Sequence, residues 1–564
     1  MIAHDVVIIG GGLAGLRAAV GLAQRWDVAV LSTVHPLRSH SGAAQGGINA
    51  AIGNAPDGRD DTPEKHAFDT VKGSDYLADQ SAVALMCQRA PEAVYELEHW
   101  GAAFSRFSDG RIAQRPFGGA GYPRACYAAD RTGHILLNTL YGRALRSGVT
   151  FHDEWTVTRL AVADGRFHGL IAYDLRRGRF ETIAAKVCLL ATGGYGRVFR
   201  NSTNALINTG SGIGIALKAG MAVKDMEFIQ FHPTTLFGSN ILITEGARGE
   251  GGHLLNRQGE RFMERTASRM MELAPRDIVA RSIQTEIDEG RGFEGGHVLL
   301  DLRHLGSATI HQRLPAIRQI CIDFAGIDPI DAPIPIQPGQ HYSMGGIDTD
   351  VTGRTQVDNV YAAGECACVS VHGANRLGGN SLLDTVVFGR LVAEDINRRA
   401  DELQDAPSES VLHDHWKLHC GRVDRLFSRP RGVTHNPLRD ALRQVCSEKV
   451  GIFRREADLS EAVDAIRALR QQYQQVRCRS AVAPFHYEIL HVLELEAQLD
   501  LAWITAAGAL ARQESRGSHS RRDFPARDDL RWLKHTVARL VEGELTLDYT
   551  GVDTSRYVPS ERTY

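Results

Sequence analysis

The first 400 or so residues alternate between two hydrophobic spacings. Short apolar runs, typical of buried parallel strands, are followed by stretches in which apolar residues recur every three or four positions, as on one face of a helix. The first run, VVII at residues 6–9, precedes a glycine turn and a predicted helix from Leu16 to Gln24. Further runs at residues 27–32, 186–194 and 360–363 predict strands of the same sheet. The pattern indicates an α/β domain built on a largely parallel sheet.

This pattern is interrupted between residues 236 and 345. Residues 263–287 have helical spacing with a break at Pro275, and residues 331–341 form a proline-rich return segment, DAPIPIQPGQH. Because proline disrupts a helix interior, these stretches predict a separate α+β unit. We therefore expect a Rossmann-like nucleotide-binding domain formed by residues 1–235 and 346–404, with a capping domain of residues 236–345 inserted into it.

Strand patterns cease after about residue 405. The segment Ser460–Val476 predicts a helix whose apolar face comprises Ala462, Ile466, Leu469, Tyr473 and Val476. Residues 487–510 predict a second long helix. We expect a helical domain at residues 405–508 and a small C-terminal domain at residues 509–564. The latter is rich in Arg and Asp, and its charges fit a solvated face and a docking surface equally well.

The turn after the first strand reads GGGLAG, from Gly10 to Gly15. Between a strand and a helix this is the GxGxxG pattern of dinucleotide-binding domains. Gly10 permits the tight turn, Gly12 lets the backbone approach a pyrophosphate, and Gly15 lets the helix pack closely on the strand. The positive end of the helix dipole then faces the phosphates. These residues predict a nucleotide site at the start of the helix.

The second strand ends at Ser32 rather than at a carboxylate. NAD-binding domains usually carry Asp or Glu at this point for the ribose hydroxyls, so NAD is a poor fit. The later strand at residues 360–363 leads into Gly364 and Glu365, which is placed to take over the ribose contact. A strand that returns late to the nucleotide domain suits FAD, and we expect Ser32 and Glu365 to bind it.

Composition narrows the class of protein further. Of 564 residues, 43% are hydrophobic and 23% charged, and the formal net charge is −3. These values suit a globular protein of two to four domains and argue against direct binding to nucleic acid or an anionic membrane. The nine cysteines contain no CxxC pair, so we expect no metal or iron–sulfur cluster in this chain. The apolar stretch at residues 501–511 is too short to span a bilayer, and a strand that begins at Asp5 leaves no room for a cleavable signal.

Cationic and hydrogen-bonding residues gather near the predicted limits of the capping domain. They are His232, Thr244, Glu245, Arg248, Arg276, His341 and Arg376. Taken singly, each arginine fits a structural ion pair and each histidine a hydrogen bond in the core. Because the whole set lies beside glycine-rich, loop-like sequence, we expect a cleft between the two domains that binds a small dicarboxylate.

Several motifs together resemble one family. They are RSHSGAAQGG at residues 38–47, DRTGH, FIQFHPT, TEGARGEGG, HYSMGG, YAAGEC, GANRLGGNSL and ESRGSHSRRDFPARDD with WLKHT. The resemblance is to the flavoprotein subunit of succinate dehydrogenase and fumarate reductase, and it covers essentially the whole chain. It implies that the nucleotide is FAD, attached at its 8α-methyl group through His40, with Ser39, Gly46 and Gly47 beside it. The attachment would help to raise the reduction potential of the flavin.

The resemblance also implies roles at the substrate. His232, His341 and Arg376 would hold the two carboxylates, with Thr244 assisting and Phe104 packing near substrate and flavin; an ordinary core position is the rival for Phe104. Arg276 would exchange a proton, relayed through Glu245 and Arg248. Free guanidinium has a pKa of roughly 12.5–13.8, so this role requires tight positioning and exclusion of water.

Two further features lie at positions that are expected to be next to the bound flavin. Asn380, Ser381 and Leu382 begin a predicted helix whose amides would stabilise negative charge on the flavin, although a side-chain cap at Asn380 or Ser381 predicts the same sequence. Where many relatives read NTGDG, this chain has Ser211 in place of the acidic residue. We expect little effect of that change on catalysis.

The implied reaction is oxidation of succinate to fumarate, with electrons leaving to a separate iron–sulfur subunit and then, through a membrane anchor, to quinone. The chain would lie at the cytoplasmic face of the inner membrane, held there by its partners. Alternatives are a fumarate reductase working in reverse, an L-aspartate oxidase with non-covalent FAD, and a flavin-stabilised scaffold without turnover. His40 argues against the oxidase, and Gln45 in place of Glu leans toward succinate oxidation.

Overall fold

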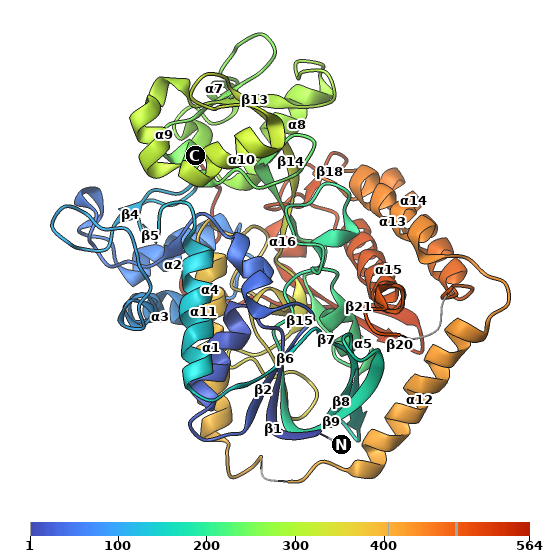
Figure 1. The fold of residues 1–564 in the computed structure, drawn as a ribbon. Helices are drawn as coiled ribbons and strands as arrows, with labels where there is room; N and C mark the ends of the chain where they lie inside the picture. Colours follow the sequence, from blue (N-terminus) through green and yellow to red (C-terminus); the bar gives the residue numbers. More distant parts are fainter. Residues whose placement is uncertain (1, 404, 480–482, 564) are drawn as a thin grey trace.

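The computed structural model describes residues 2–403, 405–479 and 483–563. The predicted domain limits at residues 1, 404 and 564 lie outside the described residues. Figure 1 shows a central sheet at the base of the molecule, a separate unit above it, and a group of long helices along one side.

The central sheet is largely parallel, as the apolar runs predict. Its strands follow the order β6-β2-β1-β9-β8-β7, and β16 also pairs with β9. The parallel strands are β6 (Thr150–Asp153), β2 (Val28–Ser32), β1 (Ile2–Ile9), β9 (Arg179–Leu190) and β16 (Val360–Ala362), and the antiparallel ones are β8 (Arg166–Asp174) and β7 (Trp155–Ala163). The helices α1 (Leu13–Leu22), α4 (Thr132–Arg146) and α11 (Asn380–Arg398) lie together on one side (Figure 1).

The register brings the carboxyl ends of four strands to one edge. Ile9 pairs with Leu31 on β2 and with Leu190 on β9, and Leu190 pairs with Ala362 on β16. The segments that follow these strands therefore meet at this edge. Ligands of open α/β sheets bind outside the carboxyl ends of the strands, so the fold itself places a site here.

Gly10 shows why the turn after β1 needs glycine. Its φ is +117°, and a Cβ atom there would lie 2.2 Å from the carbonyl oxygen of Ala191, which follows β9. A Cβ on Gly15 would lie 2.1 Å from the carbonyl oxygen of Gly10. Both contacts are too close for any side chain. The two glycines thus allow β1, β9 and α1 to converge, as the GxGxxG pattern predicts.

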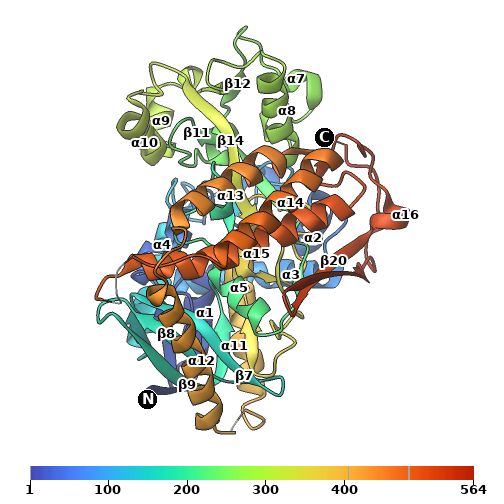
Figure 2. The same ribbon diagram turned by 90° about the vertical axis from the view of Figure 1, so that its right-hand side faces the viewer.

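The upper unit in Figures 1 and 2 has its own sheet and core. The strands β11 (Ile229–Leu236), β14 (Ile334–Ser343), β13 (Val298–Asp301) and β12 (His253–Leu255) form an antiparallel sheet in that order. A cluster of buried residues between Leu236 and Ile336 packs around it. Of residues 263–287, only those after Pro275 form a long helix, α8 (Arg276–Asp288). The residues before Pro275 form the short helix α7 (Met263–Thr266) and a 3₁₀ turn.

The long helices confirm the helical spacing near the C-terminus. α14 (Glu456–Tyr473) buries the predicted face, and α15 (Tyr487–Ala511) packs against it. Figure 2 shows α13 (His435–Lys449), α14 and α15 running side by side, with α12 (Glu409–Ser428) extending away toward the sheet.

One expectation for the C-terminal part was wrong. Strands do not cease at residue 405, because β20 (Lys534–Val541) and β21 (Glu544–Gly551) form a hairpin that joins β10 (Val223–Lys224). Some charged residues of this segment are buried, whereas others, such as Arg531, Arg556 and Glu561, are exposed. Arg512 pairs with Glu227 at 2.8 Å, and Arg516 pairs with Glu514 at 2.8 Å, with all four side chains buried. The charges join this segment to the rest of the molecule.

His535 makes one of these connections. Its Nδ1 lies 2.7 Å from Asp225 and its Nε2 3.3 Å from Asp79. Burial alone would lower the pKa of His535, but the two carboxylates raise it from 6.5 to about 9. The stabilisation by the charged imidazole is therefore complete below pH 6.5 and is lost as the pH rises through about 9.

We expect His535→Gln to lower the denaturant midpoint strongly at pH 6 and little at pH 9.5. Each unit of pKa difference corresponds to about 1.4 kcal/mol. Urea unfolding of the wild type and the variant at both pH values measures the difference, with His413→Gln on an exposed turn of α12 as control. An equal loss at both pH values would show that the imidazole acts through packing instead of charge.

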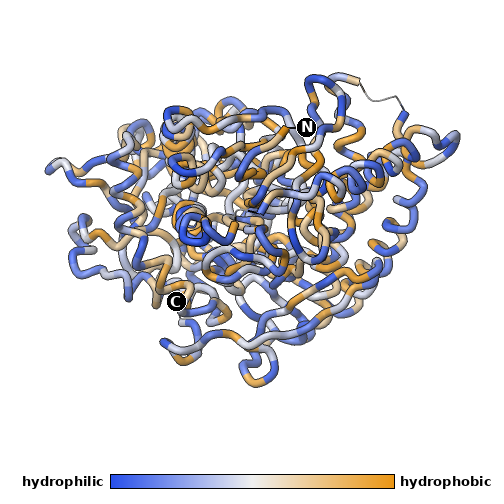
Figure 3. Tube along the Cα trace, turned by 90° about the horizontal axis from the view of Figure 1, so that it is seen from below, coloured by the Kyte–Doolittle hydropathy of each residue, from blue (hydrophilic) through white to orange (hydrophobic). Residues whose placement is uncertain are grey.

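Hydrophobic and hydrophilic residues are interleaved along the chain (Figure 3). Among the described residues, no helix has both the length and the apolar composition needed to cross a membrane.

Candidate active site

A cavity of about 550 Å³ lies at the carboxyl edge of the central sheet. The glycine turn Gly10–Gly12 and Ser32 line one part of it, and His232, Arg276 and Arg376 line another. The loop that carries His40 also contributes to the lining. The cavity thus connects the predicted nucleotide turn with the predicted dicarboxylate residues.

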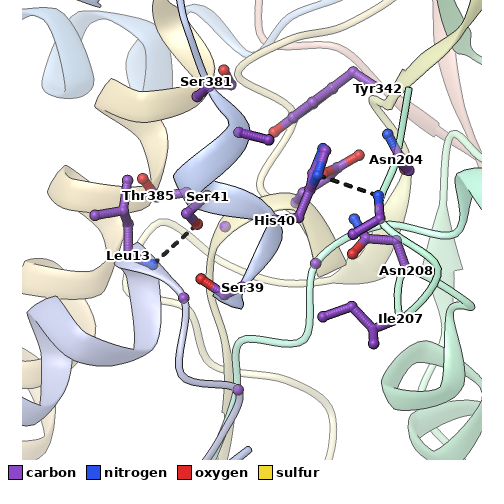
Figure 4. Close-up of a pocket in the computed structure, with 18 of the residues that line it drawn as sticks. Leu13, Ser39, His40, Ser41, Asn204, Ile207, Asn208, Tyr342, Ser381 and Thr385 are labelled. Carbon is purple, nitrogen blue, oxygen red and sulfur yellow. Dashed lines mark hydrogen bonds between the residues drawn. The ribbon is translucent and has the colours of Figure 1, made fainter. Parts of the chain in front are cut away.

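The nucleotide end is built on the start of α1. Gly12 is the N-cap of the helix, and the backbone N–H of Leu13 donates to Ser41 Oγ at 3.3 Å (Figure 4). The first amides of a helix carry partial positive charge and attract phosphate. Gly10 and Gly12 line the cavity, whereas Gly15 lies behind them and acts through packing alone.

Ser32 and Glu365 both reach the cavity, as the strand ends predict. Glu365 lies in a 3₁₀ turn, Gly364–Cys366, directly after β16, and Glu365 Oε1 accepts the N–H of Ser343 at 3.0 Å. Burial raises the pKa of Glu365 to about 7. A carboxyl group that is partly protonated at neutral pH can both donate hydrogen bonds to sugar hydroxyls and accept hydrogen bonds from them.

His40 begins a short 3₁₀ turn, His40–Ala43, and faces the loop that holds Asn204 and Asn208 (Figure 4). Its Nδ1 accepts the backbone N–H of Ala205 at 3.3 Å. That bond leaves Nε2 as the nitrogen available to a bound group. Burial lowers the pKa of His40 to about 4, so the imidazole is neutral at physiological pH.

Several buried polar atoms of the cavity residues have no hydrogen-bond partner within the described residues. They include Ser39 Oγ, Gln45 Oε1, Thr192 Oγ1, Arg197 Nε, Asn208 Nδ2 and Arg376 Nε. Leaving such groups unpaired costs about 1–3 kcal/mol each. Together with the glycine cradle at Gly10–Gly12, Gly46 and Gly47, they fit a long ligand with many polar atoms, as FAD is.

Arg276 is the first residue of α8 and is ion-paired with Glu245. Its Nε donates to Glu245 Oε2 at 2.8 Å, and Glu245 Oε1 accepts the N–H of Gly118 at 2.6 Å. Arg248 Nη2 lies 4.0 Å from Glu245 Oε1, one turn along α6 (Glu245–Gly249). Burial alone would raise the pKa of Glu245, but the two arginines lower it below its ordinary value. The three residues of the predicted relay therefore lie next to one another in the interior, and Arg248 lies behind the residues that line the cavity.

The predicted carboxylate-binding residues converge near Arg276. The rings of His232 and His341 meet edge to face with centroids 4.9 Å apart. His232 Nδ1 lies 3.1 Å from the carbonyl oxygen and 3.2 Å from the backbone nitrogen of Thr234, and His341 Nδ1 lies 2.8 Å from Thr203 Oγ1, so Nε2 of each ring remains for a ligand. Burial, followed by nearby positive charge, lowers the pKa of both histidines well below 6.5. Both rings are neutral at neutral pH, and each carries a single N–H.

Arg376 completes the group. Its Nη1 donates to Ser381 Oγ at 2.9 Å, and its guanidinium lies 4.3 Å from the centroid of the Tyr342 ring. Burial, and then the charge of Arg276, lower the pKa of Arg376 to about 9. The guanidinium lacks a carboxylate partner among the described side chains, so an anionic ligand would supply the missing charge. Thr244, which caps α6 by accepting the N–H of Gly246 at 3.2 Å, also lines this end.

Two residues missed by the sequence reasoning hold these arginines. Gln230 Oε1 accepts from Arg276 Nη1 at 3.1 Å and from Arg376 Nη2 at 3.0 Å. The hydroxyl of Tyr342 donates to Asp384 Oδ2 at 3.2 Å. Gln230 and Tyr342 stand beside predicted site residues in FIQFHPT and HYSMGG, but neither is a residue type that signals chemistry by itself.

The structure does not bring every predicted residue to the cavity. Phe104 is buried in the hydrophobic cluster that contains Ile112 and Cys126, and it is absent from the cavity lining, which corrects its expected place near substrate. Asn380 is also buried away from the cavity: its Nδ2 donates to Thr70 Oγ1 at 3.0 Å and its Oδ1 accepts from Asn49 at 2.8 Å. These hydrogen bonds hold the loop before α11 in place.

The start of α11 differs from the expected side-chain cap. Its N-cap is Gly379, with a φ of +83°, and no side-chain cap bond is formed there. A Cβ on Gly379 would lie 2.3 Å from Asn49 Oδ1, so the close approach excludes a capping side chain. Ser381 and Leu382 line the cavity beside the exposed helix start, and Ser211 lines it as the first residue of α5 (Ser211–Lys218).

Known proteins resemble the chain along its full length. The succinate dehydrogenase flavoprotein subunit of Coxiella burnetii is 44% identical over 563 residues, which cover 95% of this chain and 94% of that protein. The fumarate reductase flavoprotein subunit of Mycobacterium tuberculosis is 43% identical, with 100% and 99% covered. Among solved structures, E. coli quinol fumarate reductase FrdA matches with a TM-score of 0.95 and 38% identity, covering 100% of this chain and 99% of that chain.

The fold and the site define an FAD-binding oxidoreductase with an inserted cap. Residues 5–382 match the FAD binding domain family, and residues 439–564 match the fumarate reductase flavoprotein C-terminal family. The chain belongs to the family of succinate dehydrogenase and fumarate reductase flavoprotein subunits.

Proposed function

We propose that the chain is the flavoprotein subunit of a succinate:quinone oxidoreductase and oxidises succinate to fumarate. The observation that carries this proposal is the meeting of Arg276 and Arg376 at one end of the cavity, with two neutral histidines beside them. Two guanidinium groups and two imidazole donors match the charge and hydrogen-bonding capacity of a dicarboxylate. The glycine turn and His40 provide for FAD in the same cavity.

In this proposal Arg376, His232 and His341 bind the two carboxylates of succinate, and Thr244 adds a hydroxyl contact. Arg376 is already fixed by Ser381 and by the Tyr342 ring, so little side-chain freedom is lost on binding. Preorganised donors of this kind hold the substrate in one orientation.

Arg276, made neutral by first passing its own proton to Glu245, takes the proton from one methylene carbon. Its Nε and Nη2 contact Glu245 Oε2 at 2.8 and 2.7 Å, and Arg248, 4.0 Å from Glu245 Oε1, is the proposed next group of the relay. Bound FAD supplies the acceptor for the hydride that leaves the other methylene carbon. Loss of one proton and one hydride converts succinate to fumarate.

We infer that His40 carries the flavin as an 8α-histidyl bond through Nε2. Two features support this assignment: the backbone N–H of Ala205 occupies Nδ1, and burial lowers the pKa of His40 to about 4. In the neutral tautomer whose Nδ1 accepts this bond, the proton is on Nε2 and would leave as the bond to the flavin forms. Ser39, Gly46, Gly47, Glu365 and the helix start at Ser381–Leu382 would complete the FAD site.

The proposed partners are an iron–sulfur subunit and a membrane anchor with quinone, and the proposed location is the cytoplasmic face of the inner membrane. Full-length relatives named as subunits support this arrangement. The same site also serves fumarate reduction, and the relative from M. tuberculosis carries that name. The purified holoprotein should reduce a phenazine dye with succinate and oxidise reduced viologen with fumarate; absence of both reactions would contradict the proposal.

Arg376→Lys tests the substrate contacts. Lysine keeps a positive charge but lacks the planar fork that contacts Ser381 and a carboxylate together. We expect the KM for succinate to rise roughly 10- to 100-fold with a smaller change in kcat. Steady-state dye reduction measures both constants, with Arg390→Lys as control, because Arg390 lies on α11 outside the cavity lining and pairs with Glu92 and Glu394. An unchanged KM would remove Arg376 from the binding site.

A further inference from the structure

The site contains a buried glutamine that contacts both arginines. Gln230 lies on β11 and is fully buried, outside the residues that line the cavity. Its single carbonyl oxygen accepts from Arg276 at 3.1 Å and from Arg376 at 3.0 Å. The two guanidinium groups therefore donate to the same oxygen atom.

The orientation of the Gln230 amide is fixed from behind. Its Nε2 donates to Asn375 Oδ1 at 2.9 Å and to the carbonyl oxygen of Arg376 at 2.7 Å. Both partners are acceptors, so the nitrogen must face them and the oxygen must face the arginines. Across the β11–β14 ladder Gln230 stands opposite Tyr342, whose ring contacts Arg376.

The amide oxygen of Gln230 is uncharged, and its lack of charge affects both the buried guanidinium groups of Arg276 and Arg376 and the substrate. A carboxylate at the same place would pair with both guanidinium groups and raise their pKa values, because an opposite charge this close shifts a pKa by about 1–3 units. It would also repel the carboxylates of the substrate. An amide oxygen fixes the geometry without either effect.

We infer that Gln230 is a positioning residue for succinate oxidation: its oxygen sets the separation between the guanidinium that takes the proton and the guanidinium that binds a carboxylate, without adding negative charge. The inference rests on the proposed function and deepens it.

Gln230→Glu and Gln230→Met, both as holoprotein, separate charge from geometry. The charged and titratable groups that face Arg276 are Glu245, Arg248, His232, His341 and Arg376. With glutamate at position 230, we expect the rise of kcat with pH to move at least about 1 pH unit toward alkaline pH, and kcat at pH 7 to fall at least tenfold. With methionine, we expect KM to rise about tenfold or more without a shift of the pH profile.

Gln114→Glu is the matched control, because Gln114 is also buried and its amide bonds only to backbone groups, Asn54 N at 2.8 Å and Ala50 O at 2.8 Å among them. The flavin content of each variant corrects for losses in folding. The inference is overturned if both Gln230 variants keep the wild-type pH profile and KM once corrected, or if Gln114→Glu shows the same shift.

Binding of malonate, followed by the flavin spectrum, keeps the test separate from the proposed function. If the wild type fails to turn over succinate and fumarate, the proposed function fails. Malonate binding at least tenfold weaker in Gln230→Met still supports the positioning role, and equal binding removes it.

Discussion

Replacing Arg276 with glutamine is expected to lower succinate-dependent dye reduction by about 10²–10⁴-fold, the range over which positioned acid–base groups contribute. The guanidinium stands at the start of α8 within 2.8 Å of Glu245, and glutamine can neither take up the proton nor pass it on. Flavin binding should persist, because Arg276 lies at the dicarboxylate end of the cavity. Turnover and flavin content measured on the same preparation test both statements.

Removal of Arg276 also leaves Glu245 buried without its closest charged partner, which costs stability. Arg276→Lys restores the charge and separates this loss from the loss of proton transfer. Arg281→Gln is the control, since Arg281 lies on the same helix and bonds to Asp277 and Gly517. If Arg276→Gln retains more than about a tenth of wild-type turnover, another residue takes the proton.

Replacing His40 with alanine is expected to abolish covalent attachment of the flavin completely. No other imidazole in this loop lines the cavity, since His35, the one other histidine of residues 33–47, lies outside the lining. Succinate oxidation should fall at least tenfold, and fumarate reduction less, because loss of the bond lowers the flavin potential and about 30 mV corresponds to a factor of ten for a two-electron couple.

Acid precipitation followed by flavin fluorescence of the polypeptide measures attachment. His35→Ala, five residues upstream on the exposed side of the loop, should retain the fluorescence in the pellet. Wild-type protein that releases all its flavin into the supernatant would contradict the covalent assignment and favour an enzyme of the L-aspartate oxidase kind.

The sequence predicts the sheet and the nucleotide turn well because both follow from local rules. Apolar runs mark β1, β2, β9 and β16, and the requirement for glycine at Gly10 follows from backbone crowding. The position of Glu365 could also be predicted, since it follows a strand that returns to the same sheet edge.

Other parts depend on contacts between distant segments. Gln230 acquires its role only when β11, α8 and the loop before α11 meet, and no single-sequence pattern marks a glutamine for that role. Arg512 and Arg527 look like surface residues in the sequence, because their partners Glu227 and Asp75 lie hundreds of positions away. Phe104 shows the opposite error: an aromatic residue near a motif is more often core than site.

The residues that line the cavity extend from Ile9 to Thr385. A ribosome that has released only the glycine turn and His40 has produced no pocket, and more than 300 further residues must emerge before the walls can close. Cofactor capture is therefore expected late in biosynthesis, and His40, the proposed attachment residue, is translated long before the pocket that would hold the flavin beside it is complete.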